Sequence, residues 1–239
     1  MKTPTGHYLS FHEAALVNYA GMALAEVKGT ENTLVSELAP WPDGVKVKAA
    51  TPLKTPWRTI QLADRAGGLI ESSLILNLNE PTALENTDWI QPMKYIGIWW
   101  AMHIDKATCV QGPDHGATTE NAKRYIDFAQ QNLDSENQPI GLLVEGWNRG
   151  WNGSWIENGD KFNFTKSYPD FGLEEVVRYA EEQGVEYIAH NETSGDIQNY
   201  ESQMAEAYDY YQDLAINAIK SGYVADNGIK DLAGHNHHG

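Results

Sequence analysis

Apolar and polar positions divide this chain into two parts with different patterns. In the first third, short apolar runs follow one another, separated by turn signals rich in proline, glycine and aspartate. They predict strands over Tyr8–Leu16, Val45–Ala50, Trp57–Ala63 and Leu69–Leu78. The alanine-rich stretch Glu13–Leu24 leaves a helix open as an alternative. Consecutive short strands without intervening helices indicate an antiparallel sheet or part of a β-sandwich.

From about Trp89 the pattern alternates between apolar runs of strand length and amphipathic stretches of helical period. Predicted strands are Tyr95–Trp100, Ile140–Val144, Val185–Ala189 and Ala218–Val224, and predicted helices are Asn121–Leu133, Leu173–Gln183 and Ile197–Leu214. Thr118 or Thr119 suits the N-cap of the first helix, and Gly184 suits the end of the second. This alternation predicts a parallel sheet. Four such strands make half of a (β/α)8 barrel with uncovered sheet edges, so we expect the chain to be incomplete.

Two of these strands run directly into a carboxylate. Leu143–Asn148 contains Glu145, and Ile188–Ser194 contains Glu192. Parallel barrels present catalytic groups at the C-terminal ends of their strands, and a pair of carboxylates is what glycoside hydrolysis requires. A salt-bridged or helix-capping surface carboxylate is the alternative for each. The setting favours Glu145 and Glu192 as acid–base groups of one pocket.

Polar and aromatic residues near these strand ends suggest substrate contacts. His190 shares the strand face of Glu192 and could donate to a substrate hydroxyl or orient the carboxylate. Lys220 could bind a hydroxyl or tune a carboxylate, although a surface charge is the alternative. Indoles at strand ends and Gly/Asn-rich loops can stack on a sugar face, with core packing as the alternative. The tryptophans so placed are Trp99, Trp100, Trp147, Trp151 and Trp155. We predict substrate contacts for His190, Lys220, Trp99, Trp100 and Trp147.

Composition removes some functional classes. The chain has 33 Asp and Glu against 17 Lys and Arg, a net charge of −16, which argues against a nucleic-acid partner. No run approaches the ~20 apolar residues of a membrane span, so we expect no membrane insertion. A metal-dependent hydrolase built on His103, His115 and the terminal histidines is a weaker alternative. Their scattered spacing lacks a signature such as His-Glu-x-x-His.

Several motifs, in order along the chain, resemble glycoside hydrolase family 97, the bacterial α-glucosidases and α-galactosidases. The motifs of the second part are Gly97–His103, Gly116–Asn121, Val144–Trp151, Tyr168–Phe171 and His190–Ser194. Upstream, Pro40–Gly44, Thr55–Thr59 and Glu71–Leu74 resemble the end of that family's N-terminal β-sandwich and its link to the barrel. The likeness covers nearly the whole chain.

The resemblance implies an α/β fold in two domains. Residues 1–88 would be the C-terminal part of an N-terminal β-sandwich domain plus linker, built of antiparallel β strands. Residues 89–239 would be the first half of a (β/α)8 TIM-type catalytic barrel. The chain would then be an internal fragment of a longer enzyme.

The resemblance also implies an exo-acting, calcium-dependent α-glycoside hydrolase. Glutamates at both Glu192 and Glu145 place the chain in the inverting α-glucosidase branch, with Glu192 as general base and Glu145 in the substrate pocket. His190 and Lys220 match positions that contact sugar. Glu13 matches a sandwich glutamate that reaches the interdomain Ca²⁺.

The family's general acid and most of its calcium ligands correspond to later barrel strands than those in this chain. We therefore expect the chain alone to be weakly active or inactive. The alternatives are a non-catalytic carbohydrate-binding remnant and a retaining α-galactosidase. The expected partner is an oligosaccharide or α-glycoside substrate, with oligomers possible. From the family alone, the expected location is periplasmic or extracellular.

Overall fold

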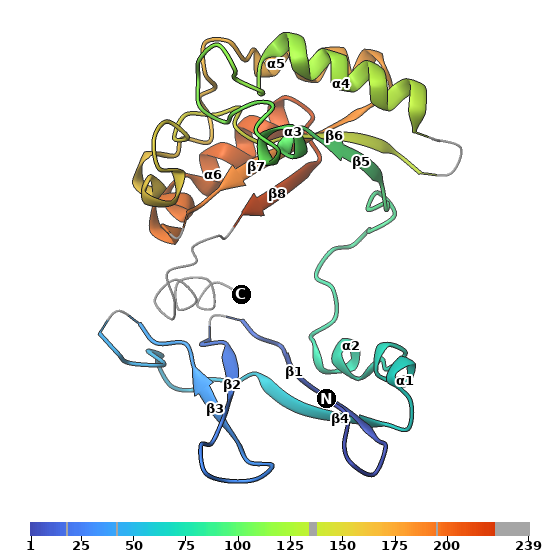
Figure 1. Cartoon of the computed structure of the whole chain (residues 1–239), viewed down its shortest axis with the longest axis vertical. Coiled ribbons are helices and arrows are strands. Elements are labelled where there is room, and N and C mark those ends of the chain that lie inside the picture. The colour runs from blue at the N-terminus through green and yellow to red at the C-terminus, as the bar shows by residue number, and fades with distance from the viewer. Residues whose placement is uncertain (18, 42, 134–137, 195, 223–239) are drawn as a thin grey trace. The chain divides into compact units, whose positions relative to one another are not determined.

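The computed structural model describes residues 1–222 apart from 18, 42, 134–137 and 195 (Figure 1). The chain forms two compact units, one from Met1 to Glu85 and one that begins at Asn86. The end of the strand expected up to Val224 and the terminal histidines lie outside the described residues. The assignment of residues 1–88 and 89–239 to two domains stays a prediction.

The first unit contains two small antiparallel sheets. Its elements are β1 (Tyr8–Ala14), β2 (Met22–Glu26), β3 (Leu34–Leu38), β4 (Trp57–Ala63), α1 (Ala66–Ile70) and α2 (Leu74–Leu78). Strand β1 pairs with β4, and β2 pairs with β3, both antiparallel. The expected antiparallel strands are therefore confirmed, with β4 at its predicted bounds.

Three local expectations for this unit are wrong. Val45–Ala50 forms no strand. Leu69–Leu78, expected as a strand, belongs largely to α1 and α2, because a short apolar run is compatible with either period. The alternative helix over Glu13–Leu24 is replaced by the end of β1 and the start of β2. Pairing of β1 with β4 overrides the weak helical preference of the alanines there.

The second unit is built on a parallel sheet. Its elements are β5 (Lys94–Gly97), α3 (Trp99–His103), α4 (Thr119–Asn132), β6 (Ile140–Val144), the 3₁₀ turns η1 (Trp155–Glu157) and η2 (Gly159–Lys161), α5 (Leu173–Glu182), β7 (Glu186–Glu192), α6 (Ile197–Asp213) and β8 (Ala218–Gly222). The strands lie in the order β5-β6-β7-β8, all parallel (Figure 1). This sheet with its helices confirms the predicted partial α/β barrel.

Two strand boundaries differ from the sequence pattern and matter for function. Strand β5 ends at Gly97, and α3 begins at Trp99, so the tryptophan pair is helical. Strand β7 continues past Ala189 to Glu192, because β8 supplies a neighbour for those residues. Val144 pairs with Ala189, and His190 pairs with Lys220. Because Val144 lies opposite Ala189, the residue that follows β6, Glu145, comes at the level of His190 on the neighbouring strand.

Helices α4 and α5 lie together on one side of the sheet (Figure 1). Each buries one stripe, Ala122, Ile126 and Ala129 in α4 and Leu173, Val176 and Ala180 in α5. All five residues of β6 are buried. Burial of each large side chain contributes about 1.5–3 kcal/mol. This cluster makes the sheet a rigid support for the strand ends.

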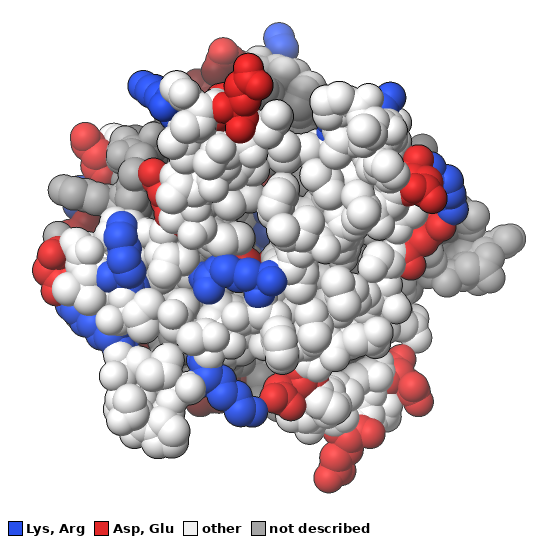
Figure 2. Space-filling view, turned by 90° about the horizontal axis from the view of Figure 1, so that it is seen from below, with Lys and Arg blue, Asp and Glu red and all other residues white. Residues whose placement is uncertain are grey.

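Charges on the protein surface are dispersed where they can be seen. On the face in Figure 2, Lys and Arg and Asp and Glu side chains are scattered among uncharged residues, and neither sign forms a continuous patch. In the described part of the chain, no helix combines the length and apolar character that a membrane span requires.

Candidate active site

A cavity of about 290 Å³ lies at the C-terminal ends of β6, β7 and β8. Its lining residues are Trp99, Glu145, Trp151, Trp155, His190, Glu192 and Lys220. They come from α3, from the loop after β6, and from the ends of β7 and β8. The parallel sheet thus brings together both predicted carboxylates and both predicted polar partners.

Glu145 and Glu192 are each 4% exposed, so neither is a solvated surface carboxylate. Oε1 of Glu145 lies 3.6 Å from Nζ of Lys220. Its Oε2 is buried and makes no hydrogen bond to the described residues. Oε1 of Glu192 accepts a hydrogen bond from the backbone N–H of Ser194 at 2.9 Å. Each carboxyl group is therefore held on one side and has acceptor capacity left for a ligand.

The environment shifts both carboxyl groups towards the neutral form. Burial raises the pKa of Glu145, and the positive charge of Lys220 opposes that rise. Burial raises the pKa of Glu192 to about 7, although the backbone N–H of Ser194 and the charge of Lys220 lower it in part. A carboxyl group that titrates near neutrality can both release and accept a proton there, as a general acid or base must.

His190 lies on β7 two residues before Glu192, at the level to which the register of β6 leads Glu145, and is 4% exposed. Burial, reinforced by the charge of Lys220, lowers the pKa of His190 to about 3. Its ring is therefore neutral over the physiological range and offers one donor and one acceptor. The Nδ1 atom is buried without a hydrogen bond to the described residues. His190 therefore has a donor and an acceptor available for a hydroxylated ligand, and its role as a substrate contact stays a prediction.

Lys220 extends from β8 with about half of its side chain exposed. Its backbone pairs with that of His190 across the sheet, and its ammonium group lies 3.6 Å from Oε1 of Glu145. Its charge lowers the pKa of both Glu145 and Glu192. The side chain therefore lies at the cavity, as predicted, and acts on both carboxyl groups.

The five tryptophans separate into two groups. Trp99, Trp151 and Trp155 line the cavity, and the rings of Trp151 and Trp155 lie 6.1 Å apart. Trp100 is 66% exposed and is not among the residues lining the cavity. Successive residues of a helix point about 100° apart, so α3 cannot direct both of its tryptophans to one place.

Trp147 is fully buried in the core rather than at the cavity surface. Its ring packs near Phe171 and Tyr211, and its Nε1–H donates to the backbone oxygen of His190 at 2.9 Å. The structure therefore does not bring Trp100 or Trp147 to the cavity. Trp151 and Trp155, which were not among the predicted substrate contacts, line the cavity instead. Their four-residue spacing in a Gly/Asn-rich loop was the available signal.

Buried amides hold the loop that carries these indoles. The side chain of Asn158 donates to the backbone oxygens of Gly150 and Asn152, and Nε1–H of Trp151 donates to Oδ1 of Asn148 at 3.1 Å. At Gly150, φ is +132° and a Cβ would lie 2.4 Å from the ring of Phe162, so only glycine fits. The cavity wall is thus fixed before any ligand arrives.

A second cavity, of about 340 Å³, is lined by Gln111, Arg149, Gly150, Asn152, Asn158, Lys161, Tyr168 and Pro169. These residues include no carboxylate. Of these two cavities, the one that holds Glu145 and Glu192 is suited to acid–base chemistry.

The predicted calcium ligand is already engaged within the first unit. Oε1 of Glu13 lies 2.9 Å from Nη2 of Arg58, and Oε2 accepts from the backbone N–H of Met22 at 2.8 Å. Ca²⁺ takes six to eight oxygen ligands. The described residues contain no cluster of three or more His, Cys, Asp or Glu side chains suited to a metal, so they do not by themselves complete such a site.

The histidines considered for a metal centre do not converge among the described residues. His103 is exposed on α3, next to the ring of Trp100. Both ring nitrogens of His115 contact protein acceptors. The terminal histidines lie outside the described residues.

Comparisons with known proteins match both parts of the chain. Residues 99–238 match the family described as glycoside hydrolase 97, and residues 1–81 match the glycosyl-hydrolase 97 N-terminal family. A curated relative, a retaining alpha-galactosidase from Bacteroides thetaiotaomicron, is 24% identical over an alignment 234 residues long that covers 89% of this chain and 32% of that protein.

Solved structures of a glycoside hydrolase family 97 enzyme from Pseudoalteromonas sp. strain K8 are 41% identical, with a TM-score of 0.84. They include complexes with acarbose and with panose. A beta-arabinopyranosidase, 18% identical with a TM-score of 0.59, shares the fold alone. The match covers 99% of this chain and 39% of the Pseudoalteromonas enzyme, so the chain spans well under half of that relative. The chain belongs to glycoside hydrolase family 97.

Proposed function

We propose that this chain contributes to an exo-acting α-glycoside hydrolase of the inverting α-glucosidase type. The observation that carries the proposal is the pair of buried glutamates in one indole-lined cavity, with Lys220 reaching Glu145 and lowering the pKa of both carboxyl groups. Membership of the family supports the same reaction class.

In this proposal Glu192 is the general base. An inverting enzyme removes a proton from water as the water oxygen attacks the anomeric carbon, while a separate acid protonates the leaving oxygen. A carboxyl group with a pKa of about 7 accepts that proton readily near neutral pH. Glu145, with its buried and unsatisfied Oε2, would accept a hydrogen bond from a sugar hydroxyl.

The remaining cavity residues would orient the sugar. The neutral ring of His190 and the ammonium group of Lys220 would bind hydroxyl groups, and the indoles of Trp151 and Trp155 would stack on the sugar face. The complexes of the Pseudoalteromonas enzyme with acarbose and panose support an oligosaccharide or α-glycoside ligand.

We assign the base but no general acid to the described residues. Loss of acid assistance typically lowers rates by about 10²–10⁴-fold, so we expect slow turnover from this chain alone. Dependence on Ca²⁺ through Glu13, and a periplasmic or extracellular location, are parts of the proposal that rest on the family alone.

Two alternatives have specific support. The Bacteroides relative, named a retaining alpha-galactosidase, favours a retaining mechanism on galactosides. The indole-lined cavity would equally serve a carbohydrate-binding remnant without turnover. In a retaining enzyme the second carboxylate attacks carbon and the product keeps the configuration of the substrate.

The test is hydrolysis of p-nitrophenyl α-glucoside and α-galactoside by the wild-type chain, by Glu192→Gln and by Glu174→Gln. Glu174 is an exposed carboxylate on α5 and serves as the matched control. We expect the first variant to lose about 10²–10⁴-fold in kcat and the control to lose nothing. The wild-type rate should rise with pH up to about 7, because Glu192 must be ionised to act as base.

Two further readings separate the alternatives. Proton NMR of the first sugar released distinguishes inversion from retention. Quenching of tryptophan fluorescence by acarbose reports binding without turnover. Turnover that is equal in the wild type and in Glu192→Gln would contradict the proposed base, whereas binding with no turnover in any variant would favour the carbohydrate-binding remnant.

A further inference from the structure

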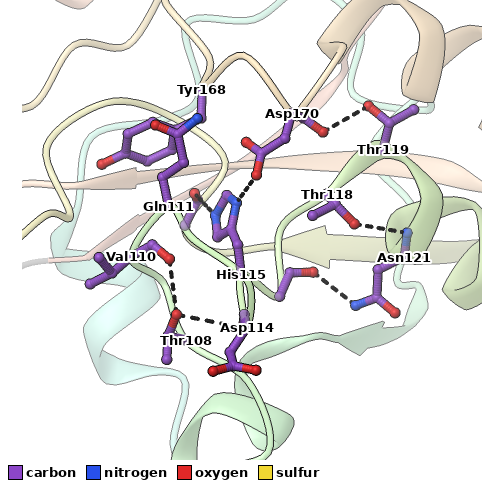
Figure 3. A network of polar contacts seen from close by, with 12 residues as sticks. Thr108, Val110, Gln111, Asp114, His115, Thr118, Thr119, Asn121, Tyr168 and Asp170 are labelled. Atoms are coloured by element: carbon purple, nitrogen blue, oxygen red, sulfur yellow. Dashed lines mark hydrogen bonds and ion pairs between the residues drawn. The ribbon is translucent and has the colours of Figure 1, made fainter.

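His115 lies between α3 and α4, away from the cavity, and its side chain is fully buried. Its Nδ1 atom lies 2.8 Å from Oδ2 of Asp170, and its Nε2 atom lies 3.1 Å from the backbone oxygen of Gly146 (Figure 3). The ring of Tyr168 meets the imidazole edge-on at 5.5 Å. Both nitrogens and the ring plane are therefore fixed.

The carbonyl group that His115 contacts belongs to the residue directly after Glu145. A carbonyl oxygen only accepts, so Nε2 carries a hydrogen and donates it to Gly146. The Gly146 φ of +83° and the 3.1 Å that would separate an added Cβ from Cα of Cys109 show how tight this turn is. A buried carbonyl oxygen that lost its donor would destabilise this turn.

The next peptide group is held as well. The backbone oxygen of Trp147 accepts from the N–H of Tyr168 at 3.0 Å, and its indole N–H reaches the oxygen of His190. Strand β6 ends at Val144, so the ladder of the sheet no longer fixes these residues. The contact from His115 instead fixes Gly146, the residue directly after Glu145.

Asp170 in turn is anchored to the start of α4. Its backbone oxygen accepts from the hydroxyl of Thr119 at 3.3 Å (Figure 3) and from the N–H of the same residue at 2.9 Å. The Thr119 hydroxyl oxygen also accepts from the N–H of Gly172 at 2.7 Å. The same helix start is capped by Thr118, whose side chain accepts from the N–H of Asn121 at 3.2 Å. A continuous set of contacts thus links the rigid end of α4 to the turn after β6.

We propose that His115 is a positioning residue for Glu145: it fixes the direction of that carboxylate through the Gly146 carbonyl, while Asp170 orients the imidazole. The catalytic meaning of this placement rests on the proposed function, but the placement itself does not. His115 does not line the cavity and would act on a substrate only through Glu145.

Two substitutions separate the two contacts of the ring. In His115→Gln the amide nitrogen lies near the place of Nε2 and can still donate to Gly146. In His115→Asn the amide nitrogen lies near the place of Nδ1 and can reach Asp170 but not Gly146. His12→Asn, at an exposed histidine of the first unit, is the matched control. If His115 acts through Gly146, the glutamine variant rescues what the asparagine variant loses.

The primary measurement is NMR of the isotopically labelled full chain and needs no turnover. We expect the carboxyl ¹³C titration of Glu145 and the indole N–H resonance of Trp147 to move in His115→Asn and to return in His115→Gln. In the wild type, an exchange-protected Nε2–H of His115 with a nuclear Overhauser contact to the Trp147 amide is expected. This last observation keeps the test decisive if the asparagine variant does not fold.

The second measurement is kcat on an aryl α-glycoside. Displacement by about 1 Å of a group that positions the substrate can cost on the order of 100-fold, so His115→Asn should lose about 10- to 100-fold in kcat with a smaller change in KM. The glutamine variant should keep most of the wild-type rate.

Equal perturbation by the two variants, or a wild-type spectrum without the protected Nε2–H, would overturn the positioning role. Expected NMR shifts in a chain that does not hydrolyse the glycoside would support positioning and count against the proposed function alone. Lower thermal stability in both variants, with the Glu145 signal unmoved, would reduce His115 to a packing residue.

Discussion

The two units of this chain differ in how they dispose of their apolar side chains. In the second unit, the β5–β8 sheet and its helices enclose one continuous buried cluster that runs from Ile98 to Ile216. In the first unit, large apolar side chains on β4 and on the two short helices stay exposed, namely Trp57, Ile60, Leu62, Ile70 and Leu76. The pattern of apolar residues therefore indicates which face is buried in the second unit. In the first unit the same kind of pattern does not indicate burial.

This difference explains where sequence-based reasoning failed. In the second unit β6 was predicted at its true bounds, because a buried strand of five apolar residues has one place in the sheet. In the first unit α1 and α2 bury none of their residues, so nothing selects a strand period over a helical one. Burial therefore decides the conformation of a short apolar run, whereas β4, which is largely exposed yet has its predicted bounds, is held by its pairing with β1.

Truncation of a core strand residue should give the largest difference in stability. Leu142→Ala removes a fully buried side chain from β6 and should lower the free energy of unfolding by about 2–5 kcal/mol. Leu62→Ala, at a residue that is 65% exposed in β4, should change it by no more than about 0.5 kcal/mol. Amide hydrogen exchange resolves each unit separately. Similar losses at both positions would mean that the first unit hides a core that its exposure does not show.

Removal of the buried Glu192 carboxylate should stabilise the second unit in a pH-dependent way. The pKa of Glu192 is raised from 4.5 to about 7, so the folded state favours its proton, and this contribution, present below pH 4.5, is lost as pH rises to about 7. Above that pH, Glu192→Gln should therefore be more stable than the wild type by about 3 kcal/mol.

The control for this effect is Glu31→Gln, which removes one exposed carboxylate from the first unit. Its effect gives the baseline for loss of a single negative charge. Thermal unfolding of wild type and both variants between pH 4 and 8 checks the prediction. A stability difference for Glu192→Gln that does not grow between pH 4.5 and 7 would show that burial does not raise the pKa of Glu192.

Helix capping gives the smallest of the expected differences. Thr118→Ala removes the side-chain acceptor at the start of α4 and should cost about 1 kcal/mol, because an N–H of the first turn loses its partner. Ser73, at the start of α2 in the first unit, makes no side-chain cap hydrogen bond, so Ser73→Ala should cost nearly nothing. Denaturant titration with exchange detection measures both. A larger cost at Ser73 would reverse the contrast between the units.

The candidate site was partly accessible from sequence. Glu145, His190 and Glu192 could be found because each lies just beyond the end of a predicted parallel strand, and Lys220 because it lies on the next strand of the same sheet. The tryptophans could not be sorted, because the choice between Trp100 and Trp155 depends on helix phase and loop path. Two contacts could not be predicted from the spacing of residues in the sequence: the hydrogen bond from the indole of Trp147 to the backbone oxygen of His190, and the contact of His115 with Gly146.

By itself the sequence determined the alternation of strands and helices after residue 89, the carboxylates at the strand ends and the family motifs. These depend on the residue type and on the local period, which neighbours along the chain specify. Only the tertiary structure decided the short helices of the first unit, the reach of β7 to Glu192, the burial that raises its pKa, and the contact from His115 to Gly146. Each of these arises from groups far apart in sequence, whose packing and desolvation exist only once the sheet has formed.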